Sequence, residues 1–392
     1  MKLAKQMRIL TMSIVFCFSI ICVTPMQADT KKRDRVNRLR SLFVVPQSSL
    51  LVGDCVTEPN GSIRFWSLED GRLTHVIDLG MGEWSHAVAI SHDGNSIAVT
   101  LLTSGEVGCY SIKDRKWKWR VKWMEKNVVD SKIKFASDDQ TIIVLGSQNT
   151  VTYDANTGNI IKKAEDMSRF SGGHSLYSVP LTVLSQSGRY AAVWQGRLEH
   201  NEWSFKSAFQ SKWAVVWNLE KNKIIADMKR VATRYKNCGG TFDPGEKYLT
   251  LGSMDGHIRV WAIDDGQLVK DWKAYWGDKA LPFDSDAAPY AISSMTFSSD
   301  GHLLATLGKE KIPSTANIKL WDFSTSSLLH EFEDVTRTTG LCDVYPMTFS
   351  ADGETFAFEK EGQLCLYEAS TWKEKWCVNT LPDVEPIKKE IK

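Results

Sequence analysis

The stretch GHIRVWAIDDGQLVKDW (residues 256–272) contains two apolar segments separated by a polar turn. Polar and apolar residues alternate over residues 257–260, which is typical of a β-strand. Gly266 closes the turn, and glycine readily adopts the positive φ that a tight hairpin requires. The stretch therefore predicts a β-hairpin with a tryptophan, Trp261, near the end of its first strand.

The same hairpin recurs along the chain. Related copies occupy residues 61–79, 105–122, 149–166, 212–229, 316–334 and 362–379. The aromatic residues near the end of the first strand of each copy are Trp66, Tyr110, Tyr153, Trp217, Trp261, Trp321 and Tyr367. Most of them are about 44 residues apart, which is typical of a repeat architecture. The two longer intervals contain insertions at residues 199–212 and 275–290.

A second hairpin precedes each of these copies. Its clearest examples are MTFSSDGHLLATLG (295–308) and MTFSADGETFAFE (347–359), in which an Asp-Gly turn joins two apolar strands. Each repeat therefore contains four short strands, and the chain contains seven repeats. Strands such as 142–145 (IIVL) are apolar on both faces and require cover on both. We predict an all-β fold, a seven-bladed β-propeller of four-stranded antiparallel blades over residues 41–380.

The repeats resemble the WD40-repeat family of β-propellers across nearly all of the predicted propeller. The matching motifs are Phe297-Ser298 with Asp300-Gly301, a similar pattern at 349–353, and the dipeptide Trp321-Asp322. The resemblance implies that Ser253, Asp255 and Trp261 belong to a structural hydrogen-bonded tetrad in the fifth repeat. The turns at 110–119 and 153–163 also resemble quinoprotein-type propeller repeats, which share the blade architecture.

Large aromatic residues fit the wedge-shaped spaces between blades. We therefore expect blade packing from the repeat tryptophans, namely Trp66, Trp217, Trp261 and Trp321.

The N-terminal residues predict an export signal. Lys2, Lys5 and Arg8 precede an apolar run over residues 9–23, and Ala28 stands before a charged segment. This order is typical of a cleaved signal peptide, here residues 1–28, and the run is shorter than the ~20 residues of a membrane-spanning helix. An uncleaved anchor is the alternative. We therefore expect an exported protein (periplasmic, secreted or at the cell surface) with no integral membrane segment after cleavage.

Short charged segments flank the predicted propeller, a basic N-terminal arm at residues 29–40 and a polar C-terminal tail at residues 381–392. Cleavage after residue 28 removes three basic and no acidic side chains, so the formal charge of +1 becomes −2. A nearly neutral chain lacks the electrostatic footprint of a nucleic-acid-binding protein. We therefore expect no nucleic-acid partner.

Six cysteines follow residue 28, an even number that suits disulfide formation in an exported protein: Cys55, Cys109, Cys238, Cys342, Cys365 and Cys377. Their spacing contains neither a CxxC pair nor a mixed Cys/His ligand pattern, so we predict no metal site. Cys365 and Cys377 lie on neighbouring strands around one turn and form one candidate disulfide.

The family resemblance also bears on how the ring closes. The first repeat begins with an inner strand near Leu42 and the last ends its outer strand near Cys377, so the seventh blade needs no strand from the N-terminus. The family topology places Cys55 and Cys342 in connections on one face of these neighbouring blades. We predict a Cys55–Cys342 disulfide at this seam, and two free thiols are the alternative.

The sequence contains no recognised catalytic motif. It has no G-x-S-x-G elbow and no phosphate-binding loop. We interpret His86 and His92 as turn and edge residues, and Asp138-Asp139 as turn residues, because Asp is common in turns. We therefore predict a non-enzymatic protein with no catalytic residue and no cofactor. The alternative is a quinoprotein-like or hydrolytic propeller enzyme with a site at the central channel.

The connections between blades are the better candidates for function. They emerge on one face in this topology and are rich in aromatic and Arg residues, which are enriched at interaction hot spots. The candidate partner-binding residues are Trp84, Tyr177, Arg234, Tyr235, Tyr275, Trp276, Tyr290, Arg337 and Tyr345. We predict a scaffold that binds a protein or peptide on this face, with the insertion 275–290 as a contact loop. Packing of these side chains over the blade ends is the alternative.

Overall fold

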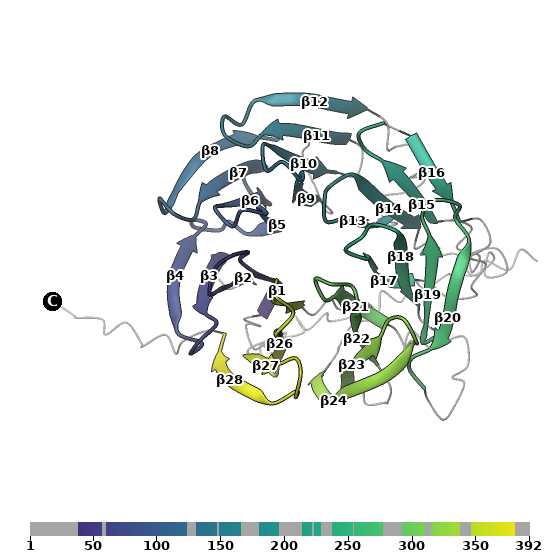
Figure 1. Ribbon diagram of the computed structural model, residues 1–392. Coiled ribbons are helices and arrows are strands. Elements are labelled where there is room, and N and C mark those ends of the chain that lie inside the picture. The colour runs from purple at the N-terminus through teal and green to yellow at the C-terminus, as the bar shows by residue number, and fades with distance from the viewer. Residues whose placement is uncertain are drawn as a thin grey trace, which may run out of the picture. The chain divides into compact units, whose positions relative to one another are not determined.

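The structure of the protein is a computed structural model (Figure 1). It describes residues 38–56, 60–123, 131–146, 149–165, 180–195, 214–221, 223–228, 237–253, 255–276, 292–309, 315–337 and 346–380. The chain divides into two units, Met1–Val36 and Asn37–Lys392. The predicted signal peptide (1–28) and polar tail (381–392) lie outside the described residues.

The described strands form seven four-stranded antiparallel sheets, which confirms the predicted blades. Blade 1 contains β1 (Arg38–Val44), β2 (Leu50–Val56), β3 (Ser62–Ser67) and β4 (Leu73–Asp78). Blade 2 contains β5 (Ser85–Ile90), β6 (Ser96–Leu101), β7 (Glu106–Ser111) and β8 (Lys116–Lys122). Blade 3 contains β9 (Lys132–Phe135), β10 (Thr141–Leu145), β11 (Asn149–Asp154) and β12 (Ile160–Glu165). Strand β1 thus begins within the predicted basic arm.

The remaining blades follow the same order along the chain. Blade 4 contains β13 (Pro180–Leu184), β14 (Tyr190–Gln195), β15 (Ala214–Asn218) and β16 (Lys223–Asp227). Blade 5 contains β17 (Asn237–Phe242), β18 (Tyr248–Ser253), β19 (His257–Ala262) and β20 (Leu268–Lys273). Blade 6 contains β21 (Ile292–Phe297), β22 (Leu303–Lys309), β23 (Thr315–Asp322) and β24 (Ser327–Arg337). Blade 7 contains β25 (Met347–Phe349), β26 (Thr355–Lys360), β27 (Gln363–Glu368) and β28 (Glu374–Asn379).

The aromatic residue that marks each repeat lies at a β-bulge. In every described blade the register between the third and fourth strands shifts at this residue. In blade 5, Val260 pairs with Lys270 whereas Trp261 pairs with Leu268, which leaves Val269 on β20 unpaired. A bulge bends its strand and increases the local twist, so the repeated sequence signal corresponds to a repeated bend at the outer edge of each blade.

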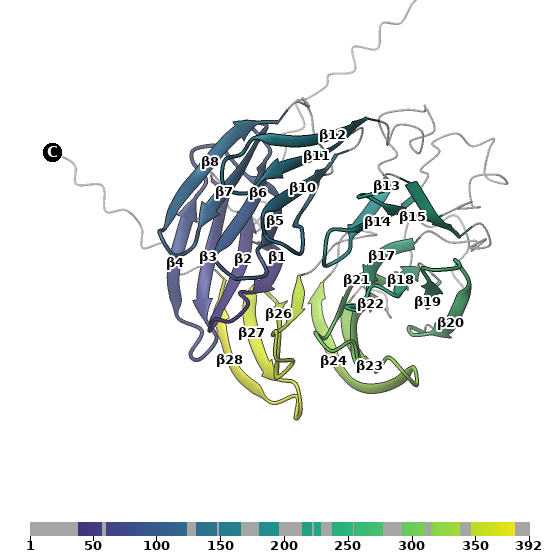
Figure 2. The same ribbon diagram turned by 45° about the horizontal axis from the view of Figure 1, so that its top comes forward.

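The blades form a ring (Figure 1). Their innermost strands contact one another in the order β1, β5, β9, β13, β17, β21 and β25, and β25 contacts β1. Figure 2 shows the blades from an oblique direction, standing side by side. Each of the seven interfaces between neighbouring blades contains its own apolar cluster. These clusters form the core, and they explain why the strands are apolar on both faces.

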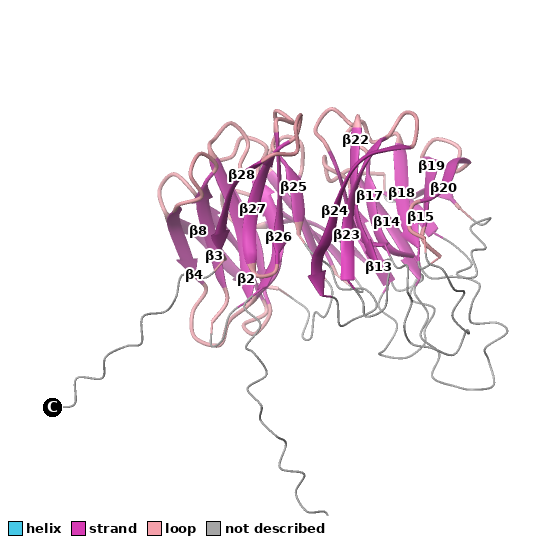
Figure 3. Ribbon diagram, turned by 90° about the horizontal axis from the view of Figure 1, so that it is seen from below, coloured by secondary structure: helices cyan, strands magenta, loops and turns pink. Residues whose placement is uncertain are grey.

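The two ends of the strands carry different segments (Figure 3). The turns inside each hairpin, such as residues 91–95 and 263–267, lie at one end, which we call the hairpin face. The links between the second and third strands and between successive blades, such as residues 102–105 and 79–84, lie at the other end, which we call the connection face. The insertions 199–212 and 275–290 fall in such links.

Among the described strands, none is shared between blades 7 and 1 at their seam, as the sequence predicts. An apolar cluster that includes Leu39, Trp66 and Leu366 fills the seam. Hydrogen bonds between described residues also cross it, among them Leu39 N to Glu359 Oε2 (3.1 Å), Arg64 Nη1 to the Thr380 carbonyl oxygen (3.1 Å) and Trp376 Nε1 to the Leu68 carbonyl oxygen (3.0 Å). Side-chain packing and these bonds therefore close the ring.

The prediction of a Cys55–Cys342 disulfide is wrong for Cys55, which is a free thiol. Cys55 lies inside β2 and not in a loop; it pairs with Leu39 across the strands and is 2% exposed within the seam cluster. Burial raises the pKa of its thiol, which disfavours the reactive thiolate. Cys342 lies outside the described residues. Cys365 and Cys377 do form a disulfide, at directly paired positions of β27 and β28 whose Cα atoms are 4.1 Å apart.

Candidate functional site

The predicted partner-binding residues are only partly described. Tyr177, Arg234, Tyr235, Tyr290 and Tyr345 lie outside the described residues. Arg337 is the last residue of β24, and its side chain also lies outside them. Trp84, Tyr275 and Trp276 are described, and they occupy three different environments.

Tyr275 is not a surface contact, and this part of the prediction is wrong. The side chain is fully buried where blade 5 leads into blade 6. Its hydroxyl donates to the carbonyl oxygen of Thr306 (2.8 Å). Its ring packs against Gly308, where an added Cβ atom would lie only 2.8 Å from the ring. A buried tyrosine needs a hydrogen-bond partner, and the missing side chain at Gly308 makes room for its ring. Tyr275 therefore anchors the connection between two blades.

A hydrogen-bonded chain joins Tyr275 to one of the predicted packing tryptophans. Trp321 Nε1 donates to Thr306 Oγ1 (2.9 Å), and the Tyr275 hydroxyl lies 3.0 Å from the same oxygen. The chain spans the second and third strands of blade 6 and the link that enters the blade. Asp322 is the last residue of β23, and hydrogen bonds from Ser324 and Thr325 in the following turn lower the pKa of its carboxyl to about 2.

Blade 5 has a different arrangement from the tetrad that the family resemblance implies. Ser253 and Asp255 lie together, and they share Arg259 as a partner: Arg259 donates to Ser253 Oγ (2.9 Å) and to Asp255 Oδ2 (2.8 Å). Burial opposes ionisation of Asp255, but the hydrogen bonds from Arg259 and Ser253 outweigh it and lower the pKa. Trp261 packs in the cluster between blades 4 and 5.

The other two predicted packing tryptophans also lie in third strands. Trp66 on β3 is 2% exposed and packs in the seam cluster. Trp217 on β15 is partly exposed at its bulge.

Trp84 is one of three apolar residues in neighbouring links of the connection face, Met81, Trp84 and Leu102, which we call the Met81 platform. Met81 is 92% exposed and Leu102 is 44% exposed, while Trp84 is partly exposed. Leu102 N donates to the Trp84 carbonyl oxygen (2.8 Å), which ties the two segments together. Exposed apolar side chains on an ordered support are typical of interaction sites.

Glu83 connects the backbone segments that carry Trp84 and Leu102 of this platform. Its side chain is buried, and its carboxylate accepts hydrogen bonds from the backbone N–H groups of Thr103 (2.8 Å), Ser104 (2.9 Å) and Trp84 (3.2 Å). Its carbonyl oxygen accepts a further bond from Gly61 N (2.7 Å). One residue thus joins the link between blades 1 and 2 to the neighbouring loops of both blades.

Trp276 is the second exposed aromatic side chain that the structure describes on the connection face. It is 64% exposed, and Lys273 Nζ lies 5.0 Å from the centre of its ring. Trp276 directly follows Tyr275, so of these two adjacent aromatic side chains one is exposed and the other is buried. The insertion 275–290 begins here, and residues 277–291 lie outside the described residues.

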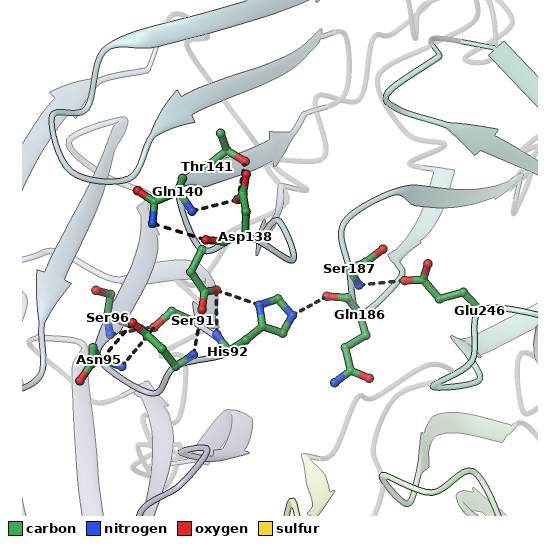
Figure 4. A network of polar contacts seen from close by, with 12 residues as sticks. Ser91, His92, Asn95, Ser96, Asp138, Gln140, Thr141, Gln186, Ser187 and Glu246 are labelled. Atoms are coloured by element: carbon green, nitrogen blue, oxygen red, sulfur yellow. Dashed lines mark hydrogen bonds and ion pairs between the residues drawn. The ribbon is translucent and has the colours of Figure 1, made fainter.

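A polar network crosses the hairpin face near the inner strands (Figure 4). It consists of His92 in blade 2, Asp139 in blade 3, Gln186 and Ser187 in blade 4, and Glu246 in blade 5, and we call it the hairpin network. The Asp139 carboxylate accepts hydrogen bonds from the backbone N–H groups of His92 and Asp93, both over 2.8 Å. Glu246 Oε1 accepts one from Ser187 N (2.8 Å). The network therefore ties the inner turns of four successive blades together.

His92 joins three of these blades. Its Nδ1 lies 2.8 Å from Asp139 Oδ1, and its Nε2 lies 3.2 Å from the carbonyl oxygen of Gln186. Both partners are acceptors, so a ring with protons on both nitrogens satisfies both contacts. The carboxylates of Asp139 and Glu246 accept hydrogen bonds from backbone N–H groups of the preceding blade, so the network holds neighbouring blades together.

The two carboxylates occupy an unusual backbone position. Asp139 (φ 55°) and Glu246 (φ 54°) adopt the left-handed conformation that glycine adopts at the equivalent place in four other inner turns: Gly94, Gly188, Gly301 and Gly353. A side chain there costs free energy, and the hydrogen bonds to the neighbouring blade offset that cost. We interpreted Asp139 and His92 as ordinary turn residues and missed their pairing. An acidic residue in place of the repeat glycine is the signal that could have found it.

Comparisons with known proteins support the architecture. No family model matches the chain. The chain is 26% identical over 184 residues to transcription initiation factor TFIID subunit 5 of Caenorhabditis elegans, covering 46% of this chain and 24% of that protein. It is 24% identical over 155 residues to transducin beta-like protein 3 of Rattus norvegicus, covering 38% of this chain and 17% of that protein. The chain thus spans less than a quarter of the length of either relative.

A solved structure has the same fold. The β-propeller domain of Cps50 (Swd1) from Myceliophteria thermophila superposes with a TM-score of 0.58 at 11% sequence identity, covering 84% of this chain and 97% of that domain. The topology and this likeness place the chain in the class of seven-bladed β-propellers. Its repeats resemble those of WD40-repeat propellers, and its sequence is similar to the two relatives over less than half of its length. Over the residues that the structure describes, no helix has the length and apolar character needed to cross a membrane.

Proposed function

We propose that this chain is an exported, non-enzymatic WD40-repeat scaffold that binds a protein or peptide through its connection face. The observation that carries the proposal is the Met81 platform, where an almost fully exposed methionine lies beside loops that a buried glutamate, Glu83, joins through three backbone hydrogen bonds. Methionine adapts its shape to a partner surface, and a preorganised support reduces the entropy lost on binding.

Three further observations support the proposal. Trp276 offers a second exposed aromatic anchor on the same face. One relative is named as a subunit of a transcription initiation factor, which is consistent with assembly with other proteins. The carboxylates of the hairpin network accept hydrogen bonds from backbone N–H groups of neighbouring blades, which is a structural role.

Partner capture tests the binding surface. The mature protein is used to capture a partner from the native envelope or secreted fraction, and its affinity is compared with that of a Met81→Ala/Leu102→Ala variant and of Trp276→Ala. Each variant is expected to weaken binding about tenfold, in line with the loss of a hot-spot residue. Leu329→Ala is the matched control, because Leu329 is an exposed apolar residue (50%) on β24, away from this face. Unchanged binding by both the Met81→Ala/Leu102→Ala variant and Trp276→Ala would contradict the assignment.

Export is tested separately. We expect the mature protein to begin after Ala28, so that its intact mass is that of residues 29–392 and it is found outside the cytoplasm. Deletion of residues 1–28 should retain the protein in the cytoplasm. A full-length mass, or an unchanged location after the deletion, would contradict the export proposal without affecting the binding surface.

A further inference from the structure

The outer rim of the seam between blades 7 and 1 depends on β28. Trp376 Nε1 donates to the Leu68 carbonyl oxygen (3.0 Å). A Cβ atom on Gly71 would lie 2.9 Å from the side chain of Trp376 and 2.8 Å from that of Val378, so both side chains pack closely against this glycine. Residues of β28 thus contact the outer turn of blade 1, and the contacts extend to Thr380, whose carbonyl oxygen accepts a hydrogen bond from Arg64.

The position of β28 makes these contacts vulnerable. It is the edge strand of its sheet and pairs with β27 alone. Edge strands have hydrogen-bond partners on one side only, and local opening begins where such support is weakest. In a ring closed by a shared strand, chain connectivity would prevent this opening, and the described strands of blades 7 and 1 lack that connection.

A disulfide lies at the centre of this strand. Cys377 stands between Trp376 and Val378, and successive residues of a strand point to opposite faces. Cys377 packs against the cluster between blades 6 and 7, whereas its two neighbours pack in the seam cluster. The bond to Cys365 therefore fixes β28 to β27 between the two side chains that contact blade 1.

We propose that the Cys365–Cys377 disulfide is a redox-sensitive clasp that holds the outer rim of the seam closed in place of a shared strand. While the bond is intact, β28 cannot separate from β27, and its contacts with blade 1 persist. Reduction removes the cross-link and leaves β28 held by the hydrogen bonds and packing of an edge strand. The strand then opens more often, and the outer rim of the seam opens with it.

The reduction step follows from the exposure of the two sulfurs. Cys377 is partly exposed and Cys365 is fully buried. A thiolate of a dithiol reductant attacks Cys377 Sγ, the S–S bond breaks, and Cys365 leaves as a thiolate that takes up a proton. The second thiol then attacks the mixed disulfide, which releases Cys377 as a thiol and oxidises the reductant to a disulfide.

Glu374 slows this reaction. One of its carboxylate oxygens and the two cysteine sulfurs lie within 4.8 Å of one another. A nearby negative charge disfavours the thiolate that must leave. The clasp is therefore protected against weak thiol reductants by a charge at the site.

Hydrogen exchange followed by mass spectrometry tests the clasp in the full chain. After reduction with dithiothreitol, peptides covering residues 68–73 and 374–380 should exchange at least about tenfold faster, because a short-loop constraint on local opening is lost. Peptides covering 257–273 in blade 5 should keep their rates. Unchanged exchange at the seam, with both thiols shown to be free, would overturn the proposal. A uniform increase over all blades would also overturn it, because the disulfide would then stabilise the whole ring and not the seam.

Two variants complete the test. A Cys365→Ser/Cys377→Ser protein should show the fast seam pattern without reductant, and reductant should not change it. If this variant does not fold, reduction of the folded wild-type protein decides the result. Glu374→Gln should be reduced a few-fold faster than the wild type, whereas Glu220→Gln, a control at an exposed acidic residue of blade 4, should not. Equal rates for Glu374→Gln and the wild type would overturn the proposed reduction route.

Discussion

Replacing Asp139 with glycine should destabilise the propeller, although glycine stands at the equivalent position of four other inner turns. The side chain of Asp139 is 14% exposed, and its carboxylate accepts two backbone hydrogen bonds from blade 2 over 2.8 Å each. The substitution relieves the left-handed strain at this residue and removes both backbone bonds, together with the contact to His92 Nδ1. The result depends on which of these effects is larger.

The magnitudes favour the hydrogen bonds. A bond to a charged group contributes about 1.5–3 kcal/mol, so two bonds at the lower end contribute about 3 kcal/mol. Relief of left-handed strain returns about 1 kcal/mol. The greater freedom of glycine in the unfolded chain costs about 0.4–1 kcal/mol. We therefore expect the Asp139→Gly variant to lose about 2–3 kcal/mol of unfolding free energy.

Urea unfolding followed by tryptophan fluorescence measures this loss as a lower midpoint with an unchanged slope. Two variants calibrate it. Asp139→Asn keeps an acceptor oxygen and tolerates the left-handed conformation, so it should lose less than Asp139→Gly. Glu246→Gly removes one backbone bond in place of two and should also lose less. An Asp139→Gly protein as stable as the wild type, or less affected than Glu246→Gly, would refute the reasoning.

Three further predictions concern buried polar groups. Tyr275→Phe keeps the ring but removes the hydrogen bond from the hydroxyl to the Thr306 carbonyl oxygen, and should lower the unfolding free energy by about 1–2 kcal/mol in the same urea assay. Glu83→Ala leaves three backbone N–H groups without an acceptor and should speed hydrogen exchange at residues 102–104; unchanged exchange would contradict its supporting role. Burial raises the pKa of Asp54, so its protonated form stabilises the folded state at low pH and this contribution is lost as pH rises through the folded-state pKa. Wild-type stability relative to Asp54→Asn should therefore fall as pH rises above the ordinary range of an aspartate carboxyl, and a difference that stays flat with rising pH would refute the shift.

Local sequence patterns were sufficient to predict the blades. The Asp-Gly turns, alternating apolar residues and repeated aromatic residues each act over a few positions, so they specify hairpins without knowledge of distant contacts. The Cys365–Cys377 disulfide was a candidate for the same reason, since both residues belong to one hairpin. The stretch at 256–272 is such a unit, and the structure adds the bulge at Trp261 that leaves Val269 unpaired.

The tertiary structure decided what the blades do to one another. Asp139 and His92 are far apart in sequence and meet only because blades 2 and 3 stand side by side. Tyr275 is buried because Gly308, in the next blade, leaves space for its ring, and no local pattern distinguishes it from the exposed Trp276. The sequence wrongly predicts a partner for Cys55 because β2 continues through Cys55 to Val56, so that the thiol lies in the seam core and not in a loop. Each of these outcomes depends on packing between blades, which a repeat pattern does not encode.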